Sequence, residues 1–328
     1  MRKKNGEPAP IFAIGDVHGC ADELDQLLGK LPLRPGCTVV FLGDYIDRGP
    51  KSRQVVDRIL ALAKEHNVVA LLGNHESMLL EYLDGRDAQR VARFVLNGGS
   101  ATLATYADEN GVCEMPTSHV EFFQNLRISH DTPTHFFVHA GVPNVLLADL
   151  DQAEYREEMI WVRKNFHRST FRWEKLIVHG HSPVPTVEIA AHRINLDTGC
   201  VYQGSLSAME FPSHRIYSVE RRMGPERTLL HDATKRAAVR FHGAIPVELD
   251  VNGTLAAFET VDYSEIGLGI RARDPARAPK LRLGSKVVGT VGPSGLFQIS
   301  FTGKVVRTAS LDGRDVYGLT VELSLLNG

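Results

Sequence analysis

The stretch Gly43-Asp44-Tyr45-Ile46-Asp47-Arg48-Gly49 decides how most of this chain is interpreted. It follows the apolar residues 38–42, which are typical of a short buried strand, so it begins a loop at a strand end. The loop contains two carboxylates and a guanidinium between glycines that let the backbone approach a ligand closely. Such a loop can form a capped turn, or it can bind a metal ion together with a phosphate. The flanking sequence favours the metal and the phosphate.

Two other apolar runs end in the same way. Residues 11–14 lead into Gly15-Asp16-Val17-His18-Gly19, and residues 68–72 lead into Gly73-Asn74-His75-Glu76. Apolar residues at helical spacing separate the three runs, so strands and helices are predicted to alternate. Because the carboxyl ends of parallel strands meet at one edge of a sheet, we expect the three loops to lie close together.

The region that follows is richer in predicted strands. Residues 135–139 and 176–178 are apolar runs that end in His139-Ala140-Gly141 and His179-Gly180-His181. Residues 77–126 instead show helical spacing, which predicts a helical cap. We therefore predict an α/β fold in which two sheets pack together with helices outside.

The polar residues at these strand ends suit a pair of divalent ions. Asp16 and His18 are two residues apart, so extended geometry would project both to the same side. A carboxylate and an imidazole suit a divalent transition metal better than calcium. Asp44 has two carboxylate oxygens, so it can bind the same ion and bridge to a second one. The residues that would complete the second site are Asn74, His139 and His181.

Two further polar residues in this region are interpreted as structural. Asp197 precedes Thr198-Gly199, and a carboxylate in that position is commonly a turn residue, so we assign it no metal role. His179 is interpreted as a buried histidine at a strand end, with a supporting role beside a metal ligand as the alternative.

The five motifs together resemble the signature motifs of the calcineurin-like metallophosphoesterases. More narrowly, they are similar to those of the PPP-type serine/threonine protein phosphatases, including bacterial and phage members. The resemblance covers residues 11–220 and implies the two-sheet αββα sandwich of that family, with a helical cap. By this resemblance the first metal ion would be held by Asp16, His18 and Asp44, and the second by Asp44, Asn74, His139 and His181.

The resemblance also implies the catalytic roles. His75 would be the general acid that protonates the leaving alkoxide, and Asp47 would orient it. A serine alkoxide is a poor leaving group, so a positioned imidazolium is expected to accelerate the reaction about 10²–10⁴-fold. A carboxylate partner is expected to keep that imidazole protonated. Arg48 and Arg163 would bind phosphate oxygens, because a planar guanidinium donates two parallel hydrogen bonds.

A second domain is predicted after residue 228. Short apolar runs separated by glycine from residue 245 onward, with separate strands expected at 295–301 and 303–308, predict a small antiparallel β-barrel. Arg236 and Arg240, followed by Asp262, Ser264 and Gly267 in a D-x-S-x-x-G pattern, resemble the motifs of PilZ domains, which bind cyclic di-GMP. The alternative is a barrel that serves for docking without a ligand. The domains expected are therefore 1–228 and 229–328, with the boundary near 225–232.

The leading functional prediction is a two-metal phosphomonoesterase that acts on phosphoserine or phosphothreonine proteins under the control of cyclic di-GMP. Manganese is the metal expected, with iron or zinc as alternatives. A second hypothesis keeps the same site but changes the substrate to a dinucleoside polyphosphate, which related bacterial enzymes hydrolyse. A third is a non-enzymatic adaptor that binds cyclic di-GMP. Glu76 argues against a cyclic-nucleotide phosphodiesterase, because that branch usually has aspartate there.

Composition excludes several other classes of protein. The formal net charge is −2, so no overall attraction to nucleic acid or acidic membranes is expected. No apolar run approaches the roughly 18 residues of a membrane span, and the polar N-terminus lacks a secretory signal. The 4 cysteines are scattered without a paired motif, which fits a reducing compartment. We therefore predict a cytoplasmic protein.

Overall fold

A computed structural model describes residues 9–84, 90, 93–108, 113–221, 241–242, 246–251, 253–264, 267–291, 299–311 and 313–324. The chain divides into two compact units. Unit 1 contains Met1–Ser77 and Pro116–Gly224, and unit 2 contains Met78–Met115 and Pro225–Gly328. The boundary expected near residues 225–232 lies outside the described residues. In the part of the chain that is described, no helix has the length and apolar character needed to cross a bilayer.

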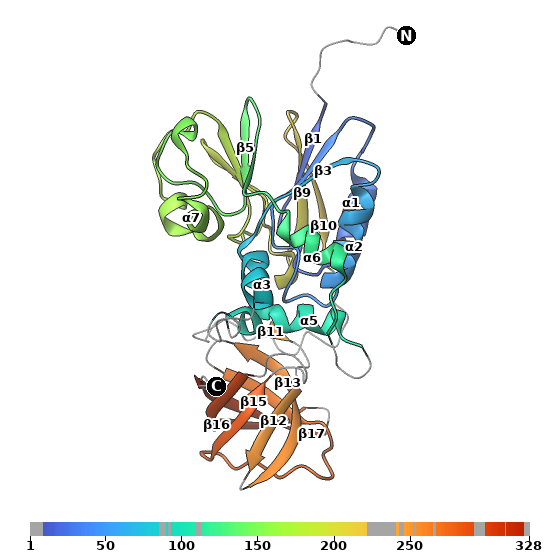
Figure 1. The fold of residues 1–328 in the computed structure, drawn as a ribbon, viewed down its shortest axis with the longest axis vertical. Coiled ribbons are helices and arrows are strands. Elements are labelled where there is room, and N and C mark those ends of the chain that lie inside the picture. The colour runs from blue at the N-terminus through green and yellow to red at the C-terminus, as the bar shows by residue number, and fades with distance from the viewer. Residues whose placement is uncertain are drawn as a thin grey trace. The chain divides into compact units, whose positions relative to one another are not determined.

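Unit 1 contains two five-stranded mixed sheets (Figure 1). The first sheet has the order β10-β9-β1-β2-β3, with β1, β2 and β3 parallel to one another. Its strands are β1 (Ile11–Ile14), β2 (Thr38–Phe41), β3 (Asn67–Ala70), β9 (Ser205–Phe211) and β10 (Arg215–Glu220). The second sheet has the order β4-β5-β6-β8-β7. Its strands are β4 (Ser129–Asp131), β5 (His135–Val138), β6 (Leu176–His179), β7 (Glu188–Ile189) and β8 (Arg193–Asn195).

The two sheets of unit 1 pack face to face around one hydrophobic core. Val40 and Met209 from the first sheet share a buried cluster with Phe137 and Val178 from the second. The next residues along β5, Phe136 and Val138, point to the opposite face, as strand alternation requires. There they pack against α7 (Arg156–Trp161) and α8 (Lys164–His167). The predicted sandwich with helices outside is therefore confirmed.

Helices also cover the outer face of the first sheet (Figure 1). α1 (Ala21–Lys30) buries an apolar stripe that includes Leu24 and Leu27, and α2 (Ser52–Leu62) buries Val55, Val56 and Ile59. α6 (Thr117–Gln124) also belongs to unit 1. Two short helical turns, η2 (Leu147–Asp149) and η3 (Cys200–Tyr202), lie in the connections of the unit. The loops that follow β1, β2 and β3 therefore emerge at one edge of a fully covered sheet.

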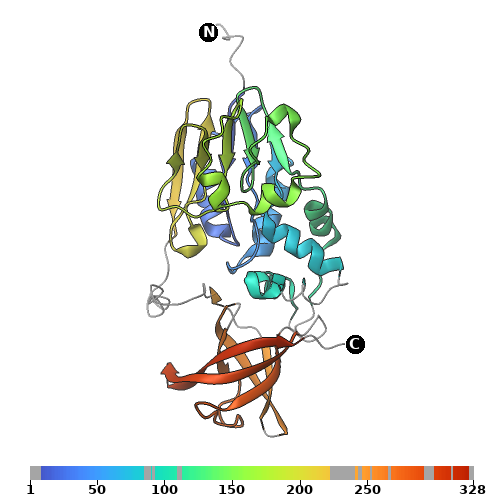
Figure 2. The same cartoon turned by 90° about the vertical axis from the view of Figure 1, so that its left-hand side faces the viewer.

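Unit 2 contains a closed six-stranded antiparallel barrel (Figure 2). The strands are β12 (Pro246–Val251), β13 (Thr254–Ser264), β14 (Gly267–Ala272), β15 (Lys286–Val291), β16 (Ile299–Leu311) and β17 (Arg314–Ser324), and the short β11 (Phe241–His242) adds to β13. Pairing of β13 with β14 closes the ring. We expected separate strands at 295–301 and 303–308, but β16 continues through Gly303 and has a bulge near Val305. The prediction was wrong because glycine fits within this strand, where it pairs with Val287 and Val321.

The predicted cap at 77–126 is helical, but its helices are divided between the two units. α3 (Asn74–Asp84) begins in unit 1 and continues past Ser77 into the residues that cluster with the barrel. η1 (Val95–Gly99) and α5 (Ser100–Tyr106) belong to unit 2. The segment 78–115 is thus part of the same compact unit as the barrel.

Candidate metal and phosphate site

The loops after β1 and β2 are joined by backbone hydrogen bonds. The amides of Val17 and His18 both donate to the Asp44 carbonyl, at 3.0 and 2.8 Å, and the Gly19 amide donates to the Tyr45 carbonyl at 2.8 Å. Their position follows from the parallel pairing of β1 with β2, which brings the two carboxyl ends to one sheet edge. These hydrogen bonds hold the first two sequence motifs side by side.

Glu76 holds the central loop in place from the first turn of α3. Its fully buried carboxylate accepts the amides of Asp44, Tyr45 and Ile46 at 2.9, 2.8 and 3.3 Å. It also accepts the amide of Gly73 at 3.2 Å. A carboxylate satisfies several aligned donors at once, so Glu76 replaces the partners that these loop amides would have in a strand. No motif in the sequence indicated this anchoring role.

Several residues of the site have an unusual backbone conformation. His18, Asp44, Asp47, Arg48 and His181 have φ values of 44°, 52°, 73°, 67° and 67°. Such left-handed conformations cost of order 1–2 kcal/mol each for residues with a Cβ. They persist because hydrogen bonds such as those to Glu76 hold the loops. These five residues with left-handed backbone conformations all belong to the predicted site.

Two glycines allow the carboxylates to approach the backbone. A Cβ added at Gly73 would overlap the Oδ1 atom of Asp44, and one added at Gly180 would overlap Oδ1 of Asp16. No other residue type fits at either position without displacing a carboxylate of the site. These glycines of the motifs therefore have a steric function.

His18 and His139 each direct an unprotonated ring nitrogen toward the site. Nδ1 of His18 lies 2.7 Å from the Ile46 carbonyl, and Nδ1 of His139 lies 2.8 Å from the Leu42 carbonyl. Because a carbonyl oxygen only accepts, each Nδ1 must bear the proton, which leaves Nε2 with its lone pair. The two Nε2 atoms lie 3.4 Å from opposite oxygens of Asp44, Oδ2 for His18 and Oδ1 for His139. This arrangement is typical of metal-binding histidines.

Further donors complete two clusters that share Asp44. His139 Nε2 lies 3.0 Å from Asn74 Oδ1 and 3.2 Å from His181 Nδ1. Among the described residues, three groups of side chains have ligand atoms within 4.8 Å of one another. Two of them belong to this site, His18, Asp44 and His75, and Asp44, His139 and His181; the third consists of Cys20, Glu23 and Cys200. Burial lowers the pKa of His18 to about 3 and also lowers that of His139. Neutral imidazoles are the form that binds metals, so the donors fit divalent ions.

Asp16 is joined to the site by the loop after β6. The His181 amide donates to both carboxylate oxygens of Asp16, at 3.1 Å each. Burial, followed by the charges of Asp197 and Asp44, raises the pKa of Asp16 well above its ordinary value. Three carboxylates close together without solvent disfavour simultaneous ionisation, and bound cations would relieve that repulsion.

Asp197 is a member of this carboxylate group that the sequence interpretation missed. It does accept the Gly199 amide at 3.0 Å, as a turn residue would. However, it is only 4 % exposed, and burial raises its pKa to about 6, with a contribution from Asp44. The available signal was its position two residues after the end of β8, as Asp16 lies two residues after the end of β1.

His75 and Asp47 form the buried pair that the resemblance implied. His75 Nδ1 lies 2.5 Å from Asp47 Oδ2, and His75 Nε2 lies 4.0 Å from Asp44 Oδ2. We expected the carboxylate to keep the imidazole protonated, but burial, followed by the Arg48 charge, lowers the pKa of His75 well below its ordinary value. Loss of solvent disfavours the charged imidazole and the paired carboxylate favours it, so the protonation of His75 stays a prediction. Nδ1–H donates to Asp47, and Nε2 faces the cluster.

Both predicted phosphate arginines reach the cluster. Arg48 Nη1 donates to His18 Nε2 at 2.6 Å, and Arg163 Nε donates to His181 Nε2 at 3.0 Å. Two aromatic rings flank these groups: the Tyr202 ring lies 5.6 Å from the Arg48 guanidinium, and the Trp161 ring lies 6.2 Å from that of His181. Positive groups at a cluster of carboxylates and imidazoles create a site for phosphate oxygens.

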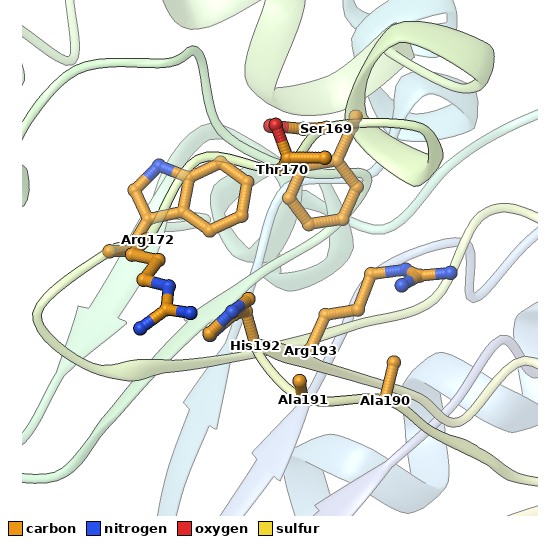
Figure 3. A pocket seen from close by; sticks show the side chains of 9 residues that line it. Ser169, Thr170, Arg172, Ala190, Ala191, His192 and Arg193 are labelled. Carbon is orange, nitrogen blue, oxygen red and sulfur yellow. The ribbon is translucent and has the colours of Figure 1, made fainter.

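His179 and a nearby pocket belong to a different part of unit 1. His179 is fully buried, and its Nδ1 donates to the Gly180 carbonyl at 3.0 Å. Its ring packs against Phe166 at 5.0 Å. Figure 3 shows the pocket, of about 340 Å³, which is lined by Phe166, Ser169, Thr170, Arg172, Trp173, Ala190, Ala191, His192 and Arg193. These lining residues include none of the predicted site residues.

The predicted cyclic di-GMP residues are only partly described. Arg236 and Arg240 lie outside the described residues. Asp262, Ser264 and Gly267 flank the connection between β13 and β14, where Asp262 pairs with Gly269 and Ser264 pairs with Gly267. Asp262 is 2 % exposed, and a Cβ added at Gly269 would overlap its carboxylate. The D-x-S-x-x-G pattern is therefore placed on two paired barrel strands.

Comparison with known proteins identifies the family. Residues 9–218 match the calcineurin-like phosphoesterase model, and residues 234–326 match that of the PilZ domain. Over 232 residues the chain is 32 % identical to bis(5'-nucleosyl)-tetraphosphatase PrpE [asymmetrical] of Anoxybacillus flavithermus, covering 63 % of this chain and 92 % of that one. The protein of the same name from Halalkalibacterium halodurans is 30 % identical over 233 residues, covering 64 % and 93 %.

A solved structure supports the same fold. The crystal structure of a putative diadenosine tetraphosphatase aligns with a TM-score of 0.51 at 23 % identity, covering 66 % of this chain and 96 % of that one. The aligned portion, 66 % of this chain, is similar in length to the phosphoesterase match over residues 9–218 and shorter than the whole chain. The chain therefore belongs to the calcineurin-like phosphoesterase family and has a C-terminal PilZ domain.

Proposed function

We propose that this chain hydrolyses bis(5'-nucleosyl) tetraphosphates asymmetrically and that cyclic di-GMP bound at the PilZ domain modulates the reaction. The observation on which the chemistry depends is the position of Asp44, whose two oxygens face His18 and His139. The substrate class is supported by the two PrpE relatives, each of which is covered over more than nine tenths of its length. These relatives favour the dinucleotide over the phosphoprotein substrate that we first predicted.

The metal ions would be held as the motifs suggested. Asp16, His18 and Asp44 would bind one ion, and the ligands of the other would be Asp44, Asn74, His139 and His181. Manganese is the ion proposed, with iron or zinc as alternatives. When bound, such a pair lowers the pKa of a water molecule and neutralises charge on phosphate oxygens.

The side chains around the metals would bind the phosphates and move a proton. The N–H groups of Arg48 and Arg163 would donate to phosphate oxygens, and both guanidiniums are within hydrogen-bonding distance of cluster histidines. Water adds to a terminal phosphorus, and the bond from that phosphorus to the bridging oxygen breaks. The products are a nucleoside monophosphate and a nucleoside triphosphate. His75 would act as an acid only after Nε2 takes up a proton, which it would then give to the leaving oxygen while Asp47 fixes the ring through Nδ1.

The two substrate classes make different demands on His75. A nucleoside triphosphate leaves as a stable anion, whereas a serine alkoxide must be protonated as it leaves. General-acid assistance is therefore worth less for the polyphosphate. We expect His75→Asn to lower kcat/KM about 10²–10⁴-fold for a phosphoserine peptide but less for diadenosine tetraphosphate.

The test is a substrate panel with the full chain and manganese. Diadenosine tetraphosphate and a phosphoserine peptide are compared in wild type, His75→Asn and the control His192→Asn, whose side chain lines the separate pocket. We expect faster turnover of the dinucleotide, AMP and ATP as products, and loss of activity with chelator that manganese restores. Turnover of the phosphopeptide alone would favour the phosphatase, and turnover of neither would favour the adaptor.

A further inference from the structure

One helix connects the candidate active site to the segment that clusters with the barrel. α3 begins at Asn74 and His75, and it continues without interruption to Asp84. Its first turn holds the central loop through Glu76. Near its other end, Tyr82 is 2 % exposed and packs its ring against Phe94 at 5.0 Å. A change in the position of Tyr82 would therefore act on the helix that presents Asn74 and His75.

Phe94 is tightly fixed within the turn that follows. Its side chain is fully buried, and a Cβ added at Gly99 would lie 2.6 Å from its ring. η1 contains a kink at Gly98, where φ is 113°, a conformation that favours glycine. This close contact ties the ring of Phe94 to the start of α5, which begins at Ser100. Packed interiors transmit displacement because they contain few voids.

A buried hydrogen bond joins Ser100 to the barrel. Ser100 Oγ donates to the Tyr263 hydroxyl at 2.8 Å, across 163 residues of sequence. Ser100 is 4 % exposed and Tyr263 is fully buried. Tyr263 lies between Asp262 and Ser264 on β13, within the predicted cyclic di-GMP motif. A hydrogen bond in a buried, low-dielectric position is costly to leave unmade, so the two elements must move together.

We propose that the Ser100–Tyr263 hydrogen bond couples cyclic di-GMP binding at β13 to the orientation of α3. The inference depends on the proposed function, because it names the route by which the messenger would act on the phosphoesterase site. The route runs from Tyr263 to Ser100, then through Gly99 and Phe94 to Tyr82 on α3. Ser100 and Tyr263 do not touch the substrate; they act by positioning α3, which begins with Asn74 and His75.

The experiment removes the two hydroxyl groups that form the Ser100–Tyr263 hydrogen bond. Tyr263→Phe and Ser100→Ala each delete one hydroxyl, and the double variant deletes both. Tyr317→Phe is the matched control, because Tyr317 is a buried tyrosine of β17 in the same barrel. On each full-length variant we measure the Kd for cyclic di-GMP, kcat/KM on diadenosine tetraphosphate with and without the messenger, and amide hydrogen exchange over residues 74–84.

We expect the two single variants to keep basal hydrolysis and to bind the messenger. In wild type, the messenger should change kcat/KM by about fivefold or more, the usual size of an allosteric coupling. In the single variants, the ratio of kcat/KM with messenger to kcat/KM without it should move toward one. The messenger-dependent change in exchange at α3 should disappear as well. The losses of response in the two single variants should be less than additive in the double variant, because each single variant already removes the Ser100–Tyr263 hydrogen bond. The control should respond as wild type does.

Failure of the inference and failure of the proposed function give different results. A Tyr263→Phe protein that responds to the messenger like wild type overturns the inference, and so does a wild type whose α3 exchange is unchanged by the messenger. A wild type that hydrolyses no dinucleoside polyphosphate contradicts the proposed function. In that case, messenger-dependent exchange at α3 that Tyr263→Phe abolishes would still support the coupling.

Discussion

The candidate phosphoesterase site in unit 1 differs in construction from the D-x-S-x-x-G motif in unit 2, which we call the messenger motif. In unit 1, strand-end loops place their polar side chains in one buried cluster, and backbone hydrogen bonds join the loops. In unit 2, Asp262 lies on a barrel strand beside Gly269, and its neighbour Tyr263 contacts Ser100 from a distant segment. Residues far apart in sequence meet in both regions, but those of the first region follow strand ends, as His181 and Asp16 do, whereas Ser100 begins a helix that contacts a barrel strand.

The largest effect is expected where a loop glycine supports the cluster. In Gly73→Ala, the new methyl group would overlap Asp44 Oδ1 and crowd the Glu76 carboxylate. Displacement of a bridging carboxylate by about 1 Å should lower kcat/KM about 10²-fold or more. The measurements are steady-state kinetics on diadenosine tetraphosphate and metal content by mass spectrometry.

Gly29→Ala is the matched control for this change. A Cβ at Gly29, within α1, meets nothing within 4 Å. Alanine there should leave activity unchanged and raise the free energy of unfolding by about 0.5–1 kcal/mol, because glycine is unfavourable inside a helix. If Gly73→Ala kept full metal content and turnover, the local geometry of the loop would not be what defines this region.

An intermediate effect is expected at the messenger motif. Asp262→Asn keeps the shape of the buried side chain but removes its charge. Loss of a hydrogen bond to a charged group costs about 1.5–3 kcal/mol, so the Kd for cyclic di-GMP should rise about 10- to 100-fold by calorimetry. Basal hydrolysis should not change. The control is Asp274→Asn, at an exposed carboxylate that pairs with Arg277. Equal affinity in both variants would exclude Asp262 from the binding site.

Within a single pH unit, the smallest effect is expected in the response of unit 1 to acid. Burial lowers the pKa of His179 to about 3, from an ordinary value of 6.5. Between these values the unfolded state binds a proton that the folded state does not, so this residue makes the protein less stable as pH falls from 6.5 toward 3. His179→Gln should reduce the slope of unfolding free energy against pH by about 1.4 kcal/mol per unit in that window.

Tryptophan fluorescence measures this slope in unit 1 specifically. The chain has 2 tryptophans, Trp161 and Trp173, and both belong to unit 1. The slopes of wild type and His179→Gln should converge above pH 6.5, which serves as an internal control. An unchanged slope below pH 6.5 would show that His179 is protonated in the folded protein.

The placement of the proposed ligand groups at one edge could be predicted because sequence and topology agree there. Asp16, Asp44 and Asn74 follow β1, β2 and β3, and the parallel pairing of these strands brings them to one edge. His139 and His181 follow β5 and β6 in the same way in the facing sheet. Short motifs after apolar runs were therefore sufficient to select them.

Other properties could not be predicted because they depend on packing in three dimensions. Burial, followed by the charge of Arg48, lowers the pKa of His75 although Asp47 is adjacent. The inclusion of Asp197 depends on the facing sheet, which brings it beside Asp16. The continuous strand β16 depends on neighbours that pair with it on both sides of Gly303.

The sequence by itself determined that the proposed metal and phosphate side chains follow strand ends, and that a barrel with a D-x-S-x-x-G pattern follows. Those signals are local, because each motif lies within a few residues of a strand end. Only the tertiary structure decided that the segment 78–115 clusters with the barrel and that Ser100 bonds to Tyr263. A contact between residues 163 positions apart depends on how whole elements pack, and no single stretch of sequence specifies it.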